Sequence, residues 1–430
     1  MTRTDPPLSS VLPPLICGTA TFNSQYNRDP YALPTTGIVH QALSLGVRAF
    51  DTSPYYGPAE NLLGQALDTP FVRDNFPRDE YYLLTKVGRI SSEEFDYSPS
   101  WVRYSVQRSL RRLKTDYLDV VYCHDVEFVS PEEVLAAIVE LRRLRDDLGV
   151  IKYVGISGYP VDRLCDLAEL VLEKTGEPLD AVMSYANFTL QNNRLKSHGI
   201  SRLQAAGVDV VPNASPLGMG LLRRGGVPIG SQGDFHPAGD GLRAAVHRAS
   251  EWTDARGEKL EVVAIRYALE TWICEGSSVG SKGDPASGVS WQRETIEDVG
   301  GKKLGVNVMG VSNIEELHET MRVWRSILDG MEDGKETAIK AGRAVSDHNW
   351  SLQRKKQIQD LTVGARKILG KYVDFAWDSP GGGFVNKRKK DDIGRPVKES
   401  LLAGESFAEP LGISVRPDGA VKEAQKSSRL

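Results

Sequence analysis

The chain has 430 residues, 40% of them hydrophobic, so it can bury a sizeable core in one large domain or two smaller ones. A formal net charge of −4 and a pI near 6.1 give no overall attraction to nucleic acid or to acidic membranes. The N-terminal residues lack the apolar core of a signal peptide, and no stretch approaches a membrane span. We therefore expect a soluble cytoplasmic protein.

The four cysteines lie far apart and form no CxxC pair. Most of them sit inside apolar runs, which predicts buried thiols in a reducing compartment rather than disulfides or zinc ligands. We accordingly expect no metal site. The cysteines are Cys17, Cys123, Cys165 and Cys274.

Short apolar runs typical of strands alternate along the chain with longer runs typical of helices. In chain order, the predicted strands cover 15–19, 47–51, 82–86, 118–124, 153–157, 181–185, 208–212 and 307–312. The helices that follow them cover 38–45, 61–67, 100–113, 131–144, 161–172, 202–206, 260–274 and 314–323.

This regular alternation indicates an α/β protein with a parallel sheet. About eight such units suit a closed (β/α)8 TIM barrel, which needs about 250 residues plus insertions. A doubly wound open sheet is the alternative. It is disfavoured because the turn after the first strand, Gly18-Thr19-Ala20-Thr21, has no GxGxxG pattern.

Composition divides the chain into three parts. Residues 1–330 form the predicted barrel, with a Gly-, Ser- and Lys-rich insertion at about 275–303, before the eighth strand. Residues 331–380 carry apolar and aromatic side chains and are expected to pack on the barrel, Trp350 and Trp377 included. Residues 381–430 are rich in Gly, Lys, Pro and Ser, which predicts a disordered tail.

Four chemically capable side chains lie at or just after the ends of consecutive predicted strands. Asp51, Lys86 and His124 end strands two, three and four, and Tyr56 lies in the loop after strand two. Because the chemistry of a barrel lies at the C-terminal ends of its strands, these side chains should converge. Each alone would be an ordinary surface or capping residue. A buried Asp and Lys side by side, however, make sense only as a compensated pair.

Together the four residues could transfer a proton. A tyrosine hydroxyl titrates near pH 10, roughly three units too high for easy proton transfer at neutral pH. A neighbouring lysine would favour the phenolate and lower that pKa, with Asp51 holding the lysine charged. His124 could donate a hydrogen bond to a substrate oxygen, and hydride transfer would need a nicotinamide.

Several ordered motifs resemble the aldo-keto reductase family over about residues 15–323. They read DTSPYYG at 51–57, LTKVG at 84–88, DYLD at 116–119 before His124, and SPLGMGLL at 215–222. The resemblance implies a catalytic tetrad of Asp51, Tyr56, Lys86 and His124. It favours Tyr56 over Tyr55, because the family's tyrosine directly precedes the glycine. The implied reaction is the reversible, NAD(P)-dependent interconversion of a carbonyl and an alcohol.

The same resemblance implies the cofactor contacts, with some departures. In place of a Ser-Asn pair after strand five the chain has Ser157-Gly158, and it has Asn213-Ala214 where relatives often place a stacking aromatic ring. Tyr185 could replace Ser184 under a one-residue shift. The implied cofactor-binding residues are Gly18, Thr19, Asp51, Ser157, Ser184, Ser215, Pro216, Leu217, Gly218, Gly220, Ser312, Asn313 and Glu316.

Glu316, beside Glu315, bears on the choice of cofactor. Relatives that prefer NADP usually carry Arg or Lys here, whereas a carboxylate repels a 2′-phosphate and accepts a hydrogen bond from a free ribose hydroxyl. NAD is therefore the predicted cofactor and NADP the alternative. Both glutamates could instead simply favour a helix N-terminus through its dipole.

Within the family, the insertion and the segment 372–380 most resemble fungal D-arabinose 1-dehydrogenases. The resemblance implies oxidation of a sugar at C1 to a lactone, with Tyr56 as the base. Plant-type L-galactose dehydrogenases, a general aldehyde or ketone reductase, and a non-catalytic regulatory subunit are the alternatives. The expected partner is a small sugar or aldehyde, with no nucleic acid and no membrane, on a monomer or weak homodimer. The ending Ser428-Arg429-Leu430 resembles a peroxisomal address, so that compartment ranks second.

Overall fold

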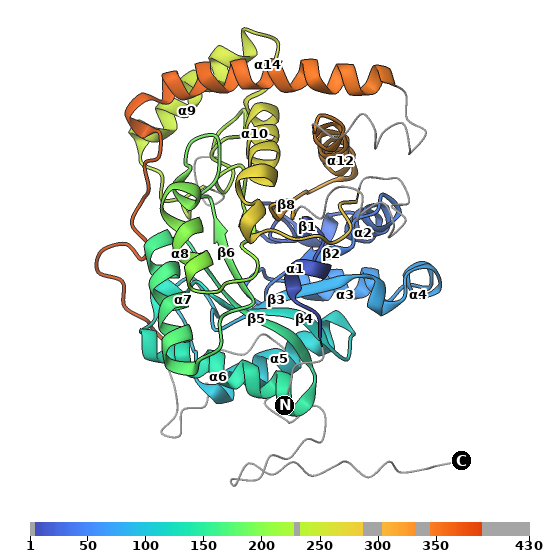
Figure 1. The fold of residues 1–430 in the computed structure, drawn as a ribbon, viewed down its shortest axis with the longest axis vertical. Coiled ribbons are helices and arrows are strands. Elements are labelled where there is room, and N and C mark those ends of the chain that lie inside the picture. The colour runs from blue at the N-terminus through green and yellow to red at the C-terminus, as the bar shows by residue number, and fades with distance from the viewer. Residues whose placement is uncertain (1–4, 228–232, 287–302, 332–344, 389–430) are drawn as a thin grey trace.

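The computed structural model describes residues 5–227, 233–286, 303–331 and 345–388. Eight parallel strands form a closed barrel in the order β1 to β8, as the alternation predicts (Figure 1). β8 pairs with both β7 and β1, which closes the sheet. The strands are β1 Leu15–Gly18, β2 Ala49–Asp51, β3 Tyr82–Val87, β4 Leu118–His124, β5 Ile151–Gly158, β6 Ala181–Tyr185, β7 Asn213–Ala214 and β8 Asn307–Gly310.

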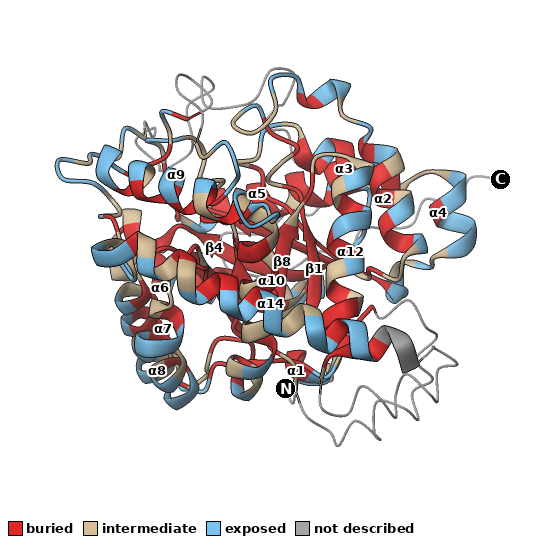
Figure 2. Cartoon of the chain, turned by 90° about the horizontal axis from the view of Figure 1, so that it is seen from above, coloured by how far each residue is buried: buried red, intermediate tan, exposed pale blue. Residues whose placement is uncertain are grey.

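A ring of helices covers the barrel and turns its polar faces outward, as Figure 2 shows by exposure. Each predicted helix is present, with ends that shift by a few residues. The helices of the ring and its loops are α2 Thr35–Ser44, α3 Ala59–Leu67, α4 Pro70–Asn75, α5 Pro99–Leu113, α6 Pro131–Leu148, α7 Val161–Thr175, α8 Ile200–Ala205, α9 Asp240–Asp254, α10 Leu260–Glu275 and α12 Ile314–Asp329.

Local sequence explains why α6 is sharply bounded. Ser130 accepts a hydrogen bond from the Glu133 backbone and Glu133 bonds back to the Ser130 backbone, which forms a capping box, and Pro131 occupies the first turn. At the other end Gly149 takes the left-handed conformation, with φ of +66°. These signals place β5 directly after the helix.

The core has an inner and an outer layer. The inner layer fills the barrel with side chains such as Ile16, Leu84, Val120 and Tyr153. Helix α1, Leu8–Val11, belongs to this cluster through Leu8 and closes the N-terminal end of the barrel. The larger outer layer lies between the strands and the surrounding helices. Packing therefore leaves the opposite, C-terminal end of the barrel free for a site.

The predicted position of strand seven is met only in part, since Val210 forms one isolated parallel bridge to Ala181. The sequence predicts 208–212, whereas the ladder of β7 contains only Asn213 and Ala214. Val211 donates its amide hydrogen to Val279 instead of to β8, and Pro212 has no amide hydrogen to donate. Pairing with β8 therefore starts where Asn213 donates to Val306.

Two helices beyond the barrel form a second packed unit. Helix α14, Val345–Leu369, crosses over α9, α10 and α12 at one side of the molecule (Figure 1). The sequence did not predict α9. Leu242 and Val246 of α9 and Leu361 of α14 are buried in one hydrophobic cluster. This cluster joins the C-terminal helix to the barrel.

After α14 and the short helix Gly370–Tyr372, the chain returns along the barrel; we call residues 373–388 the C-terminal strap. Trp377 stacks on Tyr159 of the β5 end, with ring centroids 4.6 Å apart. Further on, Phe384 packs edge-on against Phe95 and Phe128. The strap's contacts continue to Arg388, which pairs with Asp96, so described packing extends past residue 380, the expected start of the tail.

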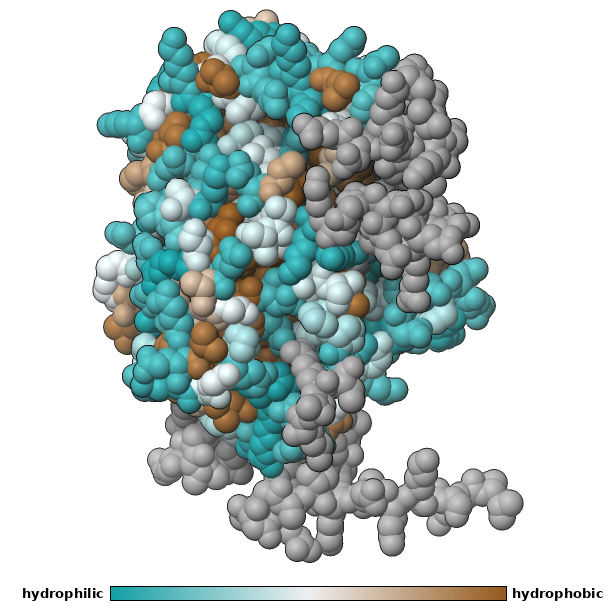
Figure 3. Space-filling view, in the orientation of Figure 1, coloured by the Kyte–Doolittle hydropathy of each residue, from teal (hydrophilic) through white to brown (hydrophobic). Residues whose placement is uncertain are grey.

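The face seen in Figure 3 is mostly hydrophilic, with hydrophobic side chains scattered over it. Among the described residues, no helix is long and apolar enough to cross a membrane. Cys17, Cys123 and Cys165 are buried, whereas Cys274 is exposed. Trp350 lies exposed on α14 rather than packed.

Some expectations fall outside the described residues. They concern most of the insertion, at 287–302, part of the C-terminal segment, at 332–344, and the tail from 389 to 430, with Ser428, Arg429 and Leu430.

Candidate active site

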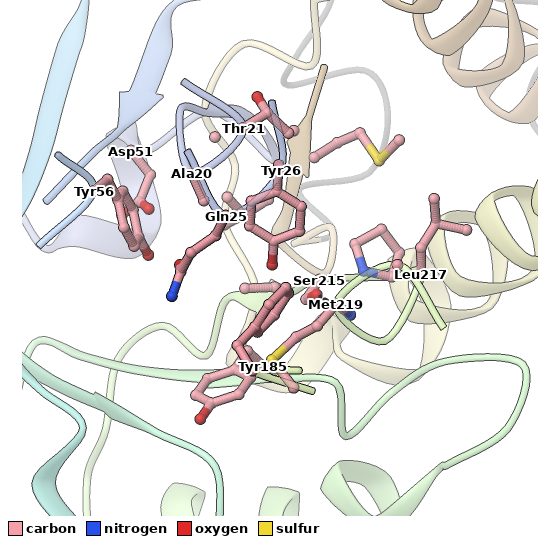
Figure 4. A pocket seen from close by; sticks show the side chains of 18 of the residues that line it. Ala20, Thr21, Gln25, Tyr26, Asp51, Tyr56, Tyr185, Ser215, Leu217 and Met219 are labelled. Atoms are coloured by element: carbon pink, nitrogen blue, oxygen red, sulfur yellow. Dashed lines mark hydrogen bonds between the residues drawn. The ribbon is translucent and has the colours of Figure 1, made fainter. Parts of the chain in front are cut away.

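A cavity of about 700 Å³ opens at the C-terminal ends of the barrel strands. All four residues of the predicted tetrad line it. Figure 4 shows Tyr56 and Gln25 pointing into this space, with Tyr26, Tyr185 and Met219 across it. The volume is typical of sites for small molecules and cofactors.

Lys86 and Asp51 form a buried ion pair at the bottom of the cavity. Lys86 Nζ lies 2.6 Å from Asp51 Oδ1 and also donates to the carbonyl of Thr52 at 2.9 Å. Register explains the contact, because Asp51 pairs with Leu84 of β3 and Lys86 lies two residues further along that strand. Burial raises the pKa of Asp51, and Lys86 offsets part of that rise.

Tyr56 lies above this pair. Its amide donates to the carbonyl of Ser53 at 3.0 Å, in the turn that follows β2. The lysine Nζ lies 4.9 Å from the centre of the tyrosine ring. Burial, Asp51 and Asp125 raise the pKa of Tyr56 well above its usual range. The expected lowering of this pKa by Lys86 is not seen, because burial has the largest effect and Asp51 and Asp125 add to it.

His124 is a neutral hydrogen-bonding group in this setting. Its ring lies edge-on to Tyr56, with centroids 5.7 Å apart. Burial lowers the pKa of His124 to about 3. Ser53 Oγ already accepts from the Tyr55 amide, so its own hydrogen can go to Nδ1, 3.1 Å away. That arrangement leaves the histidine proton on Nε2 as a donor.

The predicted cofactor residues divide into two groups. Nine line the cavity: Gly18, Asp51, Ser157, Ser215, Pro216, Leu217, Gly220, Ser312 and Glu316. The other four, which lie behind its wall, are Thr19, Ser184, Gly218 and Asn313.

Two of the residues behind the wall have local structural partners. Ser184 accepts a hydrogen bond from Asn187, and its neighbour Tyr185 lines the cavity in its place. Asn313 caps α12 by accepting the Glu316 amide at 2.7 Å. In the same cap Glu316 accepts the Ser312 amide at 2.8 Å, so the helix-capping alternative for Glu316 is present. Glu316 and Glu319 also line the cavity, and both are available to a ligand there.

The loop after β7 is shaped to approach a ligand with its backbone. Ser215, Gly218, Met219 and Gly220 all have φ between 56° and 90°. Ser215 Oγ accepts the amide of Met219 at 2.8 Å and so holds the loop wound. Positive φ and small side chains bring backbone amides close to anionic oxygens, which fits the pyrophosphate of a dinucleotide.

Gly158, which replaces the expected Asn, leaves room that Glu127 fills. A Cβ atom at position 158 would lie only 2.5 Å from Glu127 Oε2. Glu127 Oε1 accepts hydrogen bonds from the Tyr159 amide and from Ser379 of the strap, at 3.1 and 2.9 Å. Burial and the nearby Asp125 raise the pKa of Glu127 to about 8. Sequence reasoning missed this residue, although it follows His124 by only three positions.

Several residues that line the cavity were also missed. Arg89 and Asp125 face the tetrad from the loops after β3 and β4, and Trp377 and Ser379 reach it from the strap. A charged residue directly after a predicted strand end was a usable signal for Arg89 and Asp125. No local pattern could place the strap, because its contacts span more than 200 residues. Among the described residues, no cluster of His, Cys, Asp or Glu could hold a metal ion.

Comparison with known proteins agrees with this geometry. The profile of the Aldo/keto reductase family matches residues 14–333. D-arabinose 1-dehydrogenase of Saccharomyces cerevisiae is 45% identical over 62% of this chain and 78% of its own. L-galactose dehydrogenase of Arabidopsis thaliana is 33% identical over 66% of this chain and 84% of its own. The chain therefore belongs to the Aldo/keto reductase family and is an NAD(P)-dependent oxidoreductase that acts on a small molecule.

Proposed function

We propose that the protein oxidises an aldopyranose at C1 to the corresponding lactone, with NAD as the hydride acceptor. The proposal depends on one observation above all: a proton-transfer group of Tyr56, Lys86, Asp51 and His124 lines the same cavity as the loops suited to a dinucleotide. The names of the two similar sugar dehydrogenases support the substrate class.

The residues divide the work as follows. His124 donates from Nε2 to the oxygen on C1 and fixes its angle to Tyr56. The Tyr56 oxygen takes the hydroxyl proton during oxidation and returns it during reduction. Lys86, held by Asp51, offsets the charge that develops on the phenolate. When bound, the nicotinamide supplies or accepts the hydride.

Two carboxylates at the far end of the cavity favour NAD over NADP. Glu316 and Glu319 both line the wall near the start of α12. A carboxylate accepts a hydrogen bond from a free 2′-hydroxyl and repels a 2′-phosphate. Lys259 also lines the cavity, and its positive charge would favour the 2′-phosphate of NADP.

Sugar chemistry narrows the substrate class. D-arabinose and L-galactose, in the names of the two relatives, have the same configuration at C2, C3 and C4 and differ at C5. An aldopyranose with this shared configuration is therefore the favoured substrate. The C2 epimer D-ribose and the C3 epimer D-lyxose should be poorer, because a misplaced hydroxyl leaves buried polar groups unpaired.

A panel of these four sugars, with NAD⁺ and NADP⁺ in turn and NAD(P)H absorbance as the readout, tests the proposal. We expect the largest kcat/KM for D-arabinose or L-galactose with NAD⁺. Turnover of aromatic aldehydes alone would refute the sugar assignment, and a preference for NADP⁺ would refute the role of the carboxylates. Cofactor binding without turnover of any carbonyl or sugar would indicate a regulatory subunit instead.

A further inference from the structure

Beside the tetrad lies a second group of polar side chains that the proton-transfer steps do not use. We call Gln25, Tyr55, Arg89 and Asp125 the polar quartet. They come from four successive loops, those after β1, β2, β3 and β4, and all four line the cavity. Figure 4 shows Gln25 reaching into the same space as Tyr56.

The quartet is linked internally through the hydroxyl of Tyr55. Arg89 Nη2 donates to this hydroxyl at 3.0 Å and Gln25 Nε2 donates to it at 3.1 Å. The Arg89 guanidinium also lies over the Tyr55 ring, 3.8 Å from its centre. Two donors use both lone pairs of the hydroxyl, so its own hydrogen is left to donate to a third group.

Asp125 supplies an acceptor that is not yet used. Its Oδ2 atom is paired with Arg89. Its Oδ1 atom, although the residue is only 1% exposed, has no hydrogen-bond partner among the described residues. A buried carboxylate oxygen without a donor is unfavourable. Because Asp125 lines the cavity, a small rotation of its carboxylate would present this oxygen to a ligand hydroxyl.

The position of the quartet limits which part of a substrate it can reach. The Tyr55 ring lies 5.8 Å from the His124 ring and 6.3 Å from the Tyr56 ring, between centroids. Asp125 directly follows His124 in the chain. A sugar whose C1 oxygen lies between Tyr56 and His124 can therefore bring only its nearest hydroxyls to the quartet.

The charge of the quartet limits what kind of group it accepts. Arg89 and Asp125 carry opposite charges and form an ion pair, so the wall offers donors and acceptors without net charge. An unpaired arginine would instead attract a carboxylate or a phosphate. This balance fits a neutral polyol and disfavours uronates and sugar phosphates.

We propose that the polar quartet is the subsite that recognises the hydroxyl next to C1 of a neutral aldose, with Asp125 Oδ1 as the acceptor and the Tyr55 hydroxyl as the donor. This inference rests on the proposed function and extends it. The quartet residues determine specificity, and the tetrad still performs the proton transfer.

The test combines an enzyme change with a substrate change. D-arabinose is compared with 2-deoxy-D-ribose, which is D-arabinose without its 2-hydroxyl, in the wild type, Asp125→Asn and Tyr55→Phe. We expect the wild type to prefer D-arabinose in kcat/KM by at least about tenfold, since a site built to bind a hydroxyl rejects its deoxy analogue. In both variants this preference should fall to about threefold or less, mainly through loss of activity on D-arabinose.

Asp378→Asn is the matched control, because it neutralises an exposed carboxylate at the same cavity and should keep the wild-type preference. If Asp125→Asn does not fold, as judged by circular dichroism, Tyr55→Phe alone decides. A wild-type preference that persists in the folded variants, or an equal loss on both sugars, would overturn the subsite. Failure of the wild type to oxidise any aldose would instead overturn the proposed function itself.

Discussion

Tyr56 keeps its proton because its surroundings favour the neutral phenol. Burial removes water from the hydroxyl, and Asp51 and Asp125 add negative charge nearby, which together raise its pKa. The only lysine beside it in the described site is already paired with Asp51. His124 is neutral for the same reason of burial. Tyr56 therefore starts in the acid form that reduction uses, and the proposed oxidation first requires that this proton be removed.

Removing the Tyr56 hydroxyl should abolish most of the chemistry and leave the fold intact. We expect Tyr56→Phe to lower kcat about 10²- to 10⁴-fold, the usual contribution of a positioned acid or base. Steady-state kinetics in both directions measures the loss, with the thermal unfolding midpoint as the check on folding. Tyr122→Phe is the control, since it removes another buried hydroxyl from the barrel interior. Full turnover by Tyr56→Phe would contradict the proposed mechanism.

The two directions of reaction should respond differently to pH. The raised pKa of Tyr56 keeps the acid form present across the neutral range, so kcat for reduction should be flat from about pH 6 to 9. Oxidation needs the phenolate, so its rate should rise about tenfold per pH unit while proton removal limits it. A pH–rate profile in each direction checks this. An ionisation near pH 6.5 in either profile would show that His124 titrates and would contradict its low pKa.

The strap is held by contacts at several points, and one of its partners, Glu127, is an ionisable side chain. Trp377 stacks on Tyr159 at the β5 end, and Ser379 donates to Glu127 at 2.9 Å. Glu127 occupies the space that the missing side chain of Gly158 leaves. The cavity wall is thus completed by two segments that lie far apart in the sequence.

Because Glu127 is buried, the free energy of unfolding should fall as pH rises. Burial raises its folded pKa to about 8, above the unfolded value of 4.5. The folded state then holds a proton that the unfolded state has lost, so the stability present below about pH 4.5 is lost progressively up to about pH 8. Between pH 6 and 9, the unfolding midpoint of the wild type should fall relative to that of Glu127→Gln.

Glu132→Gln, at an exposed position in the first turn of α6, provides the control for this comparison and should track the wild type. Hydrogen exchange of residues 376–381 should show the same trend locally, with faster exchange in the wild type above pH 8. Parallel pH curves for the wild type and Glu127→Gln would show that Glu127 does not titrate in this range.

At the scale of the whole molecule, the barrel carries a second hydrophobic cluster on its flank. Helix α14 shares this cluster with α9 and α10 and also contacts α12. Gly364 of α14 lies against Trp252 of α9, where an added Cβ would approach the ring to 2.0 Å. The absence of a side chain at this position thus permits the two helices to pack closely.

A matched pair of glycine substitutions tests this packing. In an exposed helix, Gly→Ala should stabilise by up to about 1 kcal/mol. We expect Gly37→Ala in α2 to follow that rule, since its Cβ would meet Ile314 at an ordinary 3.4 Å. Gly364→Ala should instead lower the unfolding midpoint, because overpacking costs about 1–3 kcal/mol. Equal stabilisation by both would mean that α14 does not pack on α9 as described.

The sequence alone was enough for the fold class, for the order of most barrel elements, and for bringing the four residues of the predicted tetrad to one cavity. Each of these predictions depends on local information: the spacing of apolar residues, the residues that favour turns, and a reactive side chain at the end of a strand. In a barrel the C-terminal ends of all the strands lie at the same end, so Asp51, Lys86 and His124 could be expected close together. The resemblance to a family added the choice of Tyr56 over Tyr55.

Only the tertiary structure decided the remaining features, because they depend on contacts between distant segments. The register of β7 followed from where Val211 and Pro212 could bond, and the strap reached the cavity from the end of the described chain. The pKa of Tyr56 went opposite to expectation, since proximity to Lys86 mattered less than burial and the neighbouring carboxylates. Desolvation and charge compensation are properties of the packed site, and no local sequence pattern carries them.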